Sequence, residues 1–199
     1  MTTQQARQNE YIKEYIKPAL DDLYKNDMSI FQNNLCERCI AFRFAHYLQN
    51  KFDKDENNEY FVDCDYNSSV YFNKKTGKLE RRNGKPIPEE NQGKAKIKKR
   101  FIDIIVHKRS YNKDKNSWSD LICFELKKWN SNNSPDKNGI RPSEKDRNNL
   151  EKLTSIYGYK YGFHLIFGKE KEKTEIEIFK NGKGQGLELL SVVLTKGVA

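Results

Sequence analysis

The chain has 199 residues, 36% of them hydrophobic, which allows one well-packed core and makes a single domain the simplest organisation. Lysine and arginine outnumber aspartate and glutamate by 37 to 28, and the resulting net charge of +9 favours a polyanionic partner. No apolar run approaches the ~20 residues of a membrane span and the N-terminus lacks a signal-peptide core, so we expect a cytoplasmic protein with no membrane partner.

Two amphipathic helices are expected at the start of the chain. Residues 5–25 carry an apolar face, with Pro18 able to kink it, and this extension either caps the domain or serves a homodimer. Residues 34–48 form a second helix, with Asn34 as its start signal. At 3.6 residues per turn, Glu37 is the first residue on the apolar face of this helix. A first-turn glutamate also suits the helix dipole, but a buried acid seldom lacks a partner, so we favour a site role for Glu37.

Residues 59–66 alternate in polarity and form the first expected strand. Its acids, Asp63 and Asp65, share a face with Phe61 and are either outer groups near a metal or, as we favour, an exposed strand face.

A strongly basic segment follows. Between residues 73 and 100, eleven basic residues stand against three acidic ones, a net charge of +8. Such a segment attracts phosphates without reading bases, although a merely solvated basic loop would look the same, and its glycines and prolines suggest a partly mobile insertion. The basic residues expected to contact nucleic acid are Lys74, Lys75, Arg81, Arg82, Lys94, Lys96, Lys98, Lys99 and Arg100.

Two apolar runs, residues 101–107 and 121–127, are typical of buried strands. The first contains Asp103, and the second ends with Glu125 and Lys127, which share one strand face. Paired as an antiparallel hairpin with Asp103 opposite Glu125, the strands would bring Ile105 to Cys123 and His107 to Leu121, with the turn in residues 110–117.

Charged groups in such surroundings need partners. Two convergent carboxylates suit Mg²⁺ or Mn²⁺, which would hold a phosphate and lower the pKa of a bound water. Lys127 would then orient that water or stabilise negative charge in the transition state. The alternative is a salt-bridged strand pair in which Lys127 only neutralises Asp103 and Glu125.

Further along the chain, polar residues 130–142 predict a loop and residues 143–157 a helix that Gly158 ends. Residues 161–168 read as a buried strand and residues 174–179 as an edge strand. The tail, residues 181–199, stays unassigned.

The cysteines and histidines are expected to be structural. Cys36 and Cys39 have the spacing of half a metal site, but free buried thiols are the favoured interpretation for all four cysteines. His46, His107 and His164 lack metal-ligand spacing.

Asp103 and the Glu125-Leu126-Lys127 triplet resemble the PD-(D/E)xK phosphodiesterase superfamily. Ile102 stands where the family name has proline, which supplies no ligand. Glu37 is similar to an additional glutamate that many members carry on their first helix. The expected order of elements over residues 34–180 is similar to the family's α-β-β-β-α-β core. The resemblance implies an α/β fold with a restriction-endonuclease-like core, a central mixed β-sheet flanked by helices, after an N-terminal helical extension of residues 1–33.

The resemblance also implies a nuclease that hydrolyses phosphodiester bonds in nucleic acid, DNA in preference to RNA, with Mg²⁺ or Mn²⁺. Asp103 and Glu125 would bind the metal with help from the Leu126 carbonyl, Lys127 would position or activate water, and Glu37 would support them. Two alternatives stay open on the same fold: a nucleic-acid-binding protein without catalysis, and a protein-interaction module such as an inhibitor or decoy.

Overall fold

The computed structural model describes residues 10–129 and 142–189, apart from residues 57, 67, 74–77, 84, 92–93 and 113–116. Side chains are described for residues 10–56, 58–64, 101–108, 121–129 and 143–186. The elements, in chain order, are the π-helix η1 (Ile12–Ile16), α2 (Lys17–Asn26), α3 (Met28–Gln32), α4 (Glu37–Phe52), β1 (Tyr60–Tyr66), β2 (Ser68–Asn73), β3 (Lys78–Asn83), β4 (Lys85–Asn91), β5 (Lys94–Arg100), β6 (Ile102–Asn112), β7 (Ser117–Lys128), α5 (Pro142–Ile156), β8 (Tyr161–Phe167), the 3₁₀ turn η2 (Lys171–Lys173), β9 (Glu175–Lys180) and β10 (Lys183–Leu189).

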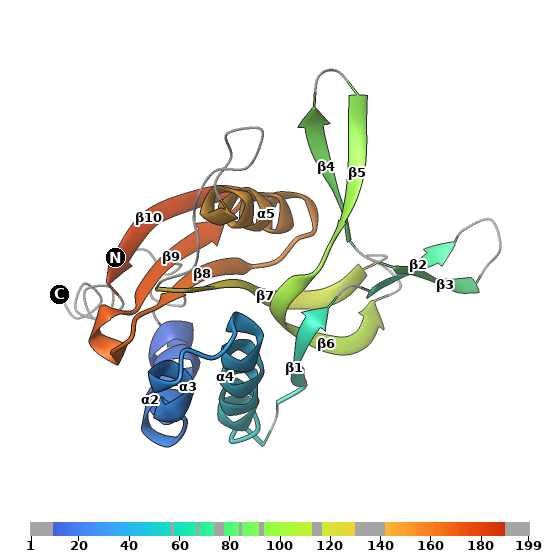
Figure 1. The fold of residues 1–199 in the computed structure, drawn as a ribbon. Coiled ribbons are helices and arrows are strands. Elements are labelled where there is room, and N and C mark those ends of the chain that lie inside the picture. The colour runs from blue at the N-terminus through green and yellow to red at the C-terminus, as the bar shows by residue number, and fades with distance from the viewer. Residues whose placement is uncertain are drawn as a thin grey trace.

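The centre of the fold is a six-stranded mixed sheet in the order β1-β6-β7-β8-β9-β10. Neighbouring strands are antiparallel except β7 and β8, which are parallel. Parallel neighbours need a crossover, and α5 supplies it. Helices α2, α3 and α4 lie on one side of the sheet and α5 on the other (Figure 1). The predicted α/β architecture, a central mixed sheet flanked by helices, is therefore confirmed.

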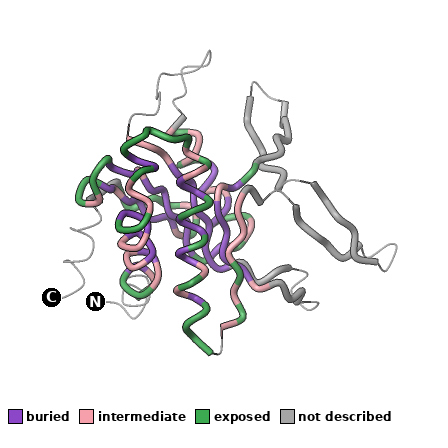
Figure 2. Tube along the Cα trace, turned by 60° about the horizontal axis from the view of Figure 1, so that its bottom comes forward, coloured by how far each residue is buried: buried purple, intermediate pink, exposed green. Residues whose placement is uncertain are grey.

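The sheet separates two apolar clusters because side chains alternate along each strand. Ile104 and Phe124 face the larger cluster, with the N-terminal helices, whereas Ile105 and Cys123 face the smaller one, with Leu150 of α5. The buried residues gather in the central strands and the helix faces against them (Figure 2). By the same alternation, the side chains of Asp103, Glu125 and Lys127 leave the backbone on the α5 side of the sheet.

The N-terminal helices bury their apolar face within the same chain. Ile16 and Leu20 are fully buried in the larger cluster, and η1 passes into α2 close to Pro18. The Tyr24 hydroxyl donates to the Gly168 carbonyl at 2.7 Å, which fastens α2 to the end of β8. The packing thus agrees with the capping role expected of this extension.

The predicted hairpin is confirmed as β6 and β7, with Ile105 opposite Cys123. The expected pairing of His107 with Leu121 is wrong: His107 lies opposite Asp120, because the register shifts between Val106 and His107. Such a β-bulge adds one residue to a strand and displaces every later partner. Residues 113–116, in the expected turn, lie outside the described part.

One other expectation is corrected. Residues 174–179 were expected to form an edge strand, but β9 is interior because β10 pairs with it, beyond the expected core boundary at residue 180. The basic segment of residues 73–100 starts at the last residue of β2 and contains β3, β4 and β5; β2 pairs with β3 and β4 with β5, each pair a separate antiparallel two-stranded sheet. Within the described part of the chain, no helix is both long and apolar enough to cross a membrane.

Candidate active site

The free edge of β7 positions two carboxylates. The backbone pairing between β6 and β7 ends at Ile104 and Phe124, so in the described part of the chain the last residues of β7 have no paired strand on that side. The N–H groups of Leu126 and Lys128 are two residues apart and point the same way. Asp103 Oδ2 accepts the Leu126 N–H at 2.8 Å, and Glu37 Oε2 accepts the Lys128 N–H at 3.1 Å. The two side chains thus replace the missing strand and are fixed by backbone donors.

Lys127 lies between two acids from different helices. Its Nζ is 3.0 Å from Glu37 Oε1 and 3.0 Å from Asp146 Oδ2, and its side chain is 18% exposed. Burial lowers the pKa of Lys127, but the charges of Asp146 and Glu37 outweigh burial and raise it above its ordinary value. Lys127 is therefore a fixed ammonium ion, held between α4 and α5.

Glu125 is the most enclosed acid of the site, with 4% of its surface exposed. The Asn149 amide donates to its Oε1 at 3.4 Å. Burial raises the pKa of Glu125 well above its ordinary value, and the charges of Asp103 and Asp146 add to the effect. The last backbone pair at this end of the hairpin is Ile104 with Phe124. Asp103 and Glu125 are the next residue of each strand.

Asp103 carries the same kind of perturbation. Burial raises its pKa to about 6, the Leu126 N–H and Lys127 oppose this, and the charges of Asp146 and Glu37 add to it. Asp103, Glu125, Glu37 and Asp146 thus all lie near the Lys127 ammonium ion. Their surplus of negative charge favours the uptake of protons or of a cation.

The donor chemistry fits a divalent metal such as Mg²⁺ or Mn²⁺. Mg²⁺ is commonly held by one or two carboxylates together with water and substrate phosphate oxygens. Asp103 and Glu125 supply such a pair, and the Leu126 carbonyl faces the same edge of β7 as its N–H group. Among the residues with described positions, no group of three or more His, Cys, Asp or Glu side chains is arranged to hold a metal.

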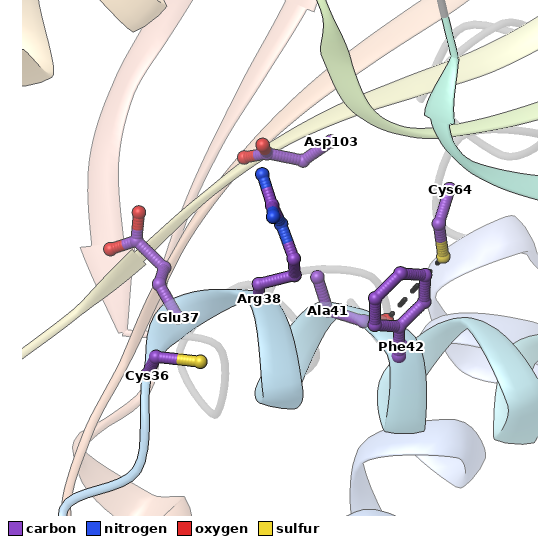
Figure 3. A pocket seen from close by; sticks show the side chains of 7 residues that line it. All are labelled: Cys36, Glu37, Arg38, Ala41, Phe42, Cys64 and Asp103. Atoms are coloured by element: carbon purple, nitrogen blue, oxygen red, sulfur yellow. Dashed lines mark hydrogen bonds between the residues drawn. The ribbon is translucent and has the colours of Figure 1, made fainter.

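A pocket of about 370 Å³ opens beside Asp103, lined by Cys36, Glu37, Arg38, Ala41, Phe42, Cys64 and Asp103. Arg38 reaches from α4 across the pocket with its guanidinium group pointing toward the Asp103 carboxylate (Figure 3). Phe42, one turn further along α4, is 51% exposed. The pocket therefore gives a ligand access to Asp103, past a guanidinium and an aromatic ring.

The predicted site residues Glu37, Asp103, Glu125 and Lys127 are brought together by these contacts. Sequence reasoning missed Asp146, Asn149, Arg38 and Phe42 as members. Asp146 lies near the start of the helix predicted at residues 143–157, where an acid is ordinary. The spacing of Arg38 and Phe42, four residues apart on one helix face, was an available signal.

Other predicted residues lie elsewhere. His107 Nε2 is 2.7 Å from Asp63 Oδ2, so both belong to a structural pair on β6 and β1. His164 is fully buried opposite Glu125, and burial first, then the charges of Lys127 and Arg147, lower its pKa to about 4. The Asp65 side chain lies outside the described part.

The basic residues expected to contact nucleic acid have side chains outside the described part. Lys74 and Lys75 are themselves outside the described residues, Arg81 and Arg82 belong to β3, and the remaining five belong to β5. β5 ends at Arg100, three residues before Asp103, so the backbone of the basic segment leads directly to the pocket.

The expectation that all four cysteines are buried is wrong. Cys36 is exposed, Cys39 and Cys64 are intermediate, and Cys123 is buried; none of the four forms a disulfide. α4 begins at Glu37 rather than at Asn34, which leaves Cys36 as the residue before the helix.

Comparisons with known proteins give no match: no family model, no curated protein and no solved structure is significantly similar to this chain. The resemblance to the PD-(D/E)xK superfamily therefore stays a prediction from Asp103 and the Glu125-Leu126-Lys127 triplet.

Proposed function

We propose that the protein is a metal-dependent nuclease of the PD-(D/E)xK type that hydrolyses phosphodiester bonds. The observation that carries the proposal is the surplus of buried negative charge around Lys127, next to a pocket that Asp103 lines. Perturbed carboxyl groups in a cleft are typical of functional sites. A divalent cation would balance the charge, and the restriction-endonuclease-like core is part of the same proposal.

Asp103 and Glu125 are proposed to hold the cation, with the Leu126 carbonyl as a further oxygen donor. A bound Mg²⁺ or Mn²⁺ would polarise the phosphate and lower the pKa of a bound water. Glu37 holds Lys127 and the Lys128 N–H in place rather than touching the substrate. Asp146 holds Lys127 from the other side.

Lys127 is proposed to orient the attacking water and to stabilise negative charge on the phosphate in the transition state. In the metal-free protein its two carboxylate partners raise its pKa, which favours the protonated form over one that accepts a proton from water. The geometry therefore favours water positioning and charge stabilisation by Lys127 over general-base catalysis.

The direct test is cleavage of a panel of single- and double-stranded DNA and RNA by the wild-type protein with Mg²⁺, with Mn²⁺ and with excess EDTA. We expect cleavage that needs the metal and is most efficient on DNA. Asp103→Asn protein, purified in parallel, serves as the control for contaminating nucleases. Equal cleavage by both proteins, or cleavage in EDTA, would contradict the proposal.

Arg38 is predicted to contact a substrate phosphate, because its guanidinium is exposed in the pocket and points toward Asp103. Arg38→Ala should raise KM by about tenfold, because losing one charge-assisted hydrogen bond costs roughly 1.4 kcal/mol of binding free energy. The free energy of unfolding should change little. Lys25→Ala is a matched control, since it removes an exposed positive charge from α2. Equal KM values for the two variants would mean that Arg38 does not contact the substrate.

A binding protein without catalysis is the second candidate. It is favoured by one observation: Lys127 already has two carboxylate partners, as in a structural ion-pair network. It predicts salt-dependent binding of nucleic acid, unchanged by Asp103→Asn, and no cleavage with either metal. The absence of both binding and cleavage would favour a protein-interaction module instead.

A further inference from the structure

Two cysteines meet at the start of α4. Cys36 is the residue before the first helical turn, in an extended conformation, and Cys39 lies within that turn. Their Sγ atoms are 3.1 Å apart. Cys36 is exposed and Cys39 is partly exposed, so reagents in solution reach the pair. A sulfur–sulfur bond is about 2.05 Å long, so a small movement within one turn would join them.

The surroundings make Cys36 the better nucleophile. The N-terminus of a helix favours a thiolate, and α4 has 16 residues. The Lys128 ammonium donates to the carbonyls of Asn34 and Leu35, so a positive charge lies just before Cys36. The hydrogen bond with Cys39 lowers the pKa of Cys36, while the same contact raises the pKa of Cys39. Cys36 is thus suited to attack a disulfide first, and Cys39 to attack the resulting mixed disulfide.

We propose that Cys36 and Cys39 form a redox-active dithiol that closes to an intramolecular disulfide by exchange with low-molecular-weight disulfides. The Cys36 thiolate attacks one sulfur of the reagent disulfide, forms a mixed disulfide and releases one thiolate. The Cys39 thiol then loses its proton, attacks Cys36 Sγ and releases the second thiol. The two protein thiols are oxidised, and one reagent disulfide is reduced to two thiols.

This site is distinct from the proposed nuclease chemistry. Neither cysteine is assigned a role in cleavage, although Cys36 lines the pocket and Glu37 follows it. The pair also differs from a metal site, because within the described ranges no group of three or more His, Cys, Asp and Glu side chains is arranged to hold an ion. Two thiols in contact suit a disulfide better.

The test is thiol chemistry on the full chain. Reduced protein is incubated with oxidised glutathione, quenched with acid and analysed by mass spectrometry and peptide mapping. We expect the wild type to lose two hydrogen atoms as a Cys36–Cys39 disulfide, and Cys39→Ser to stop at a glutathione adduct on Cys36. Cys36→Ser should react about tenfold more slowly, since the better nucleophile is gone. Cys64→Ser, which removes a thiol from the same pocket, should behave as the wild type.

A second measurement needs no substitution. Brief alkylation of the reduced wild-type protein should label Cys36 before Cys39, and should label buried Cys123 last. The proposal is overturned if wild-type protein accumulates only glutathione adducts or stays reduced, or if Cys39 is labelled first. Since neither readout involves nucleic acid, a failure of the nuclease proposal leaves this one intact.

Discussion

Asp103→Asn and Glu125→Gln are each expected to abolish metal-dependent cleavage while stabilising the metal-free protein at neutral pH. Both substitutions keep the side-chain shape, and the asparagine oxygen can still accept the Leu126 N–H. Each removes one anionic ligand of the proposed cation, so activity should fall by about 100-fold or more, the equivalent of a few kcal/mol of metal assistance. Stability should rise because each removes a buried charge that lacks a sufficient counter-charge.

The gain in stability has a defined pH dependence for Asp103. Its pKa is about 6 in the folded protein against an ordinary value of 3.8, so between these values the folded state binds more protons than the unfolded state. Stability must therefore fall as pH rises through this window, by about 2–3 kcal/mol in the limit of full burial. Glu125, Lys127, Asp146 and Glu37 face the same carboxyl group and shape the curve.

The measurement is the free energy of unfolding in urea from pH 4 to pH 7.5, with EDTA present. The wild type should lose stability with rising pH more steeply than Asp103→Asn, and the two curves should converge near pH 4. Adding Mg²⁺ at pH 7 should stabilise the wild type but not the variant, because a ligand that binds only the folded state shifts unfolding. A destabilised Asp103→Asn protein with unchanged cleavage would identify the acids as structural.

Much of this site was predictable because it depends on local spacing. The period of two along residues 101–107 and 121–127 fixed which residues share a face, and this gave the pairing of Ile105 with Cys123. The period of 3.6 placed Glu37 on the stripe that packs against the sheet, where it reaches Lys127.

The missed members depend on tertiary placement. Asp146 stands near the start of α5, where acids are favoured by the helix dipole whether or not a site lies nearby. Only the crossover of α5 over the sheet brings it to Lys127. β10 was missed for another reason: Gly184 and Gly186 weaken its strand pattern, and a register irregularity interrupts its pairing with β9.

Lys127→Met is expected to destabilise the protein by about 2–3 kcal/mol at pH 7, since removing one partner of a buried pair costs roughly 3–5 kcal/mol and this side chain is 18% exposed. Methionine preserves most of the side-chain volume, so the loss reports charge rather than packing. Without the ammonium ion, Glu37 and Asp146 keep their charges with no cation between them.

The control for Lys127→Met is Lys173→Met. Lys173 lies 3.1 Å from Glu170, and both side chains are well exposed, so breaking that pair should cost at most about 1 kcal/mol. Urea unfolding of both variants at pH 7 measures the difference. Similar losses for the two variants would mean that Lys127 is not held as a buried charge.

The double variant Glu37→Gln/Lys127→Met separates stability from chemistry. Removing the Glu37 charge should restore about 1 kcal/mol or more, because the Asp146 charge no longer faces a like charge. If Lys127 acts on the phosphate and water, this restored protein still fails to cleave, whereas Glu37→Gln alone, which keeps Lys127 paired with Asp146, retains part of its activity. Recovery of cleavage in the double variant would mean that Lys127 is only a structural counter-ion. Cleavage would then depend on the free energy of unfolding and not on the ammonium group.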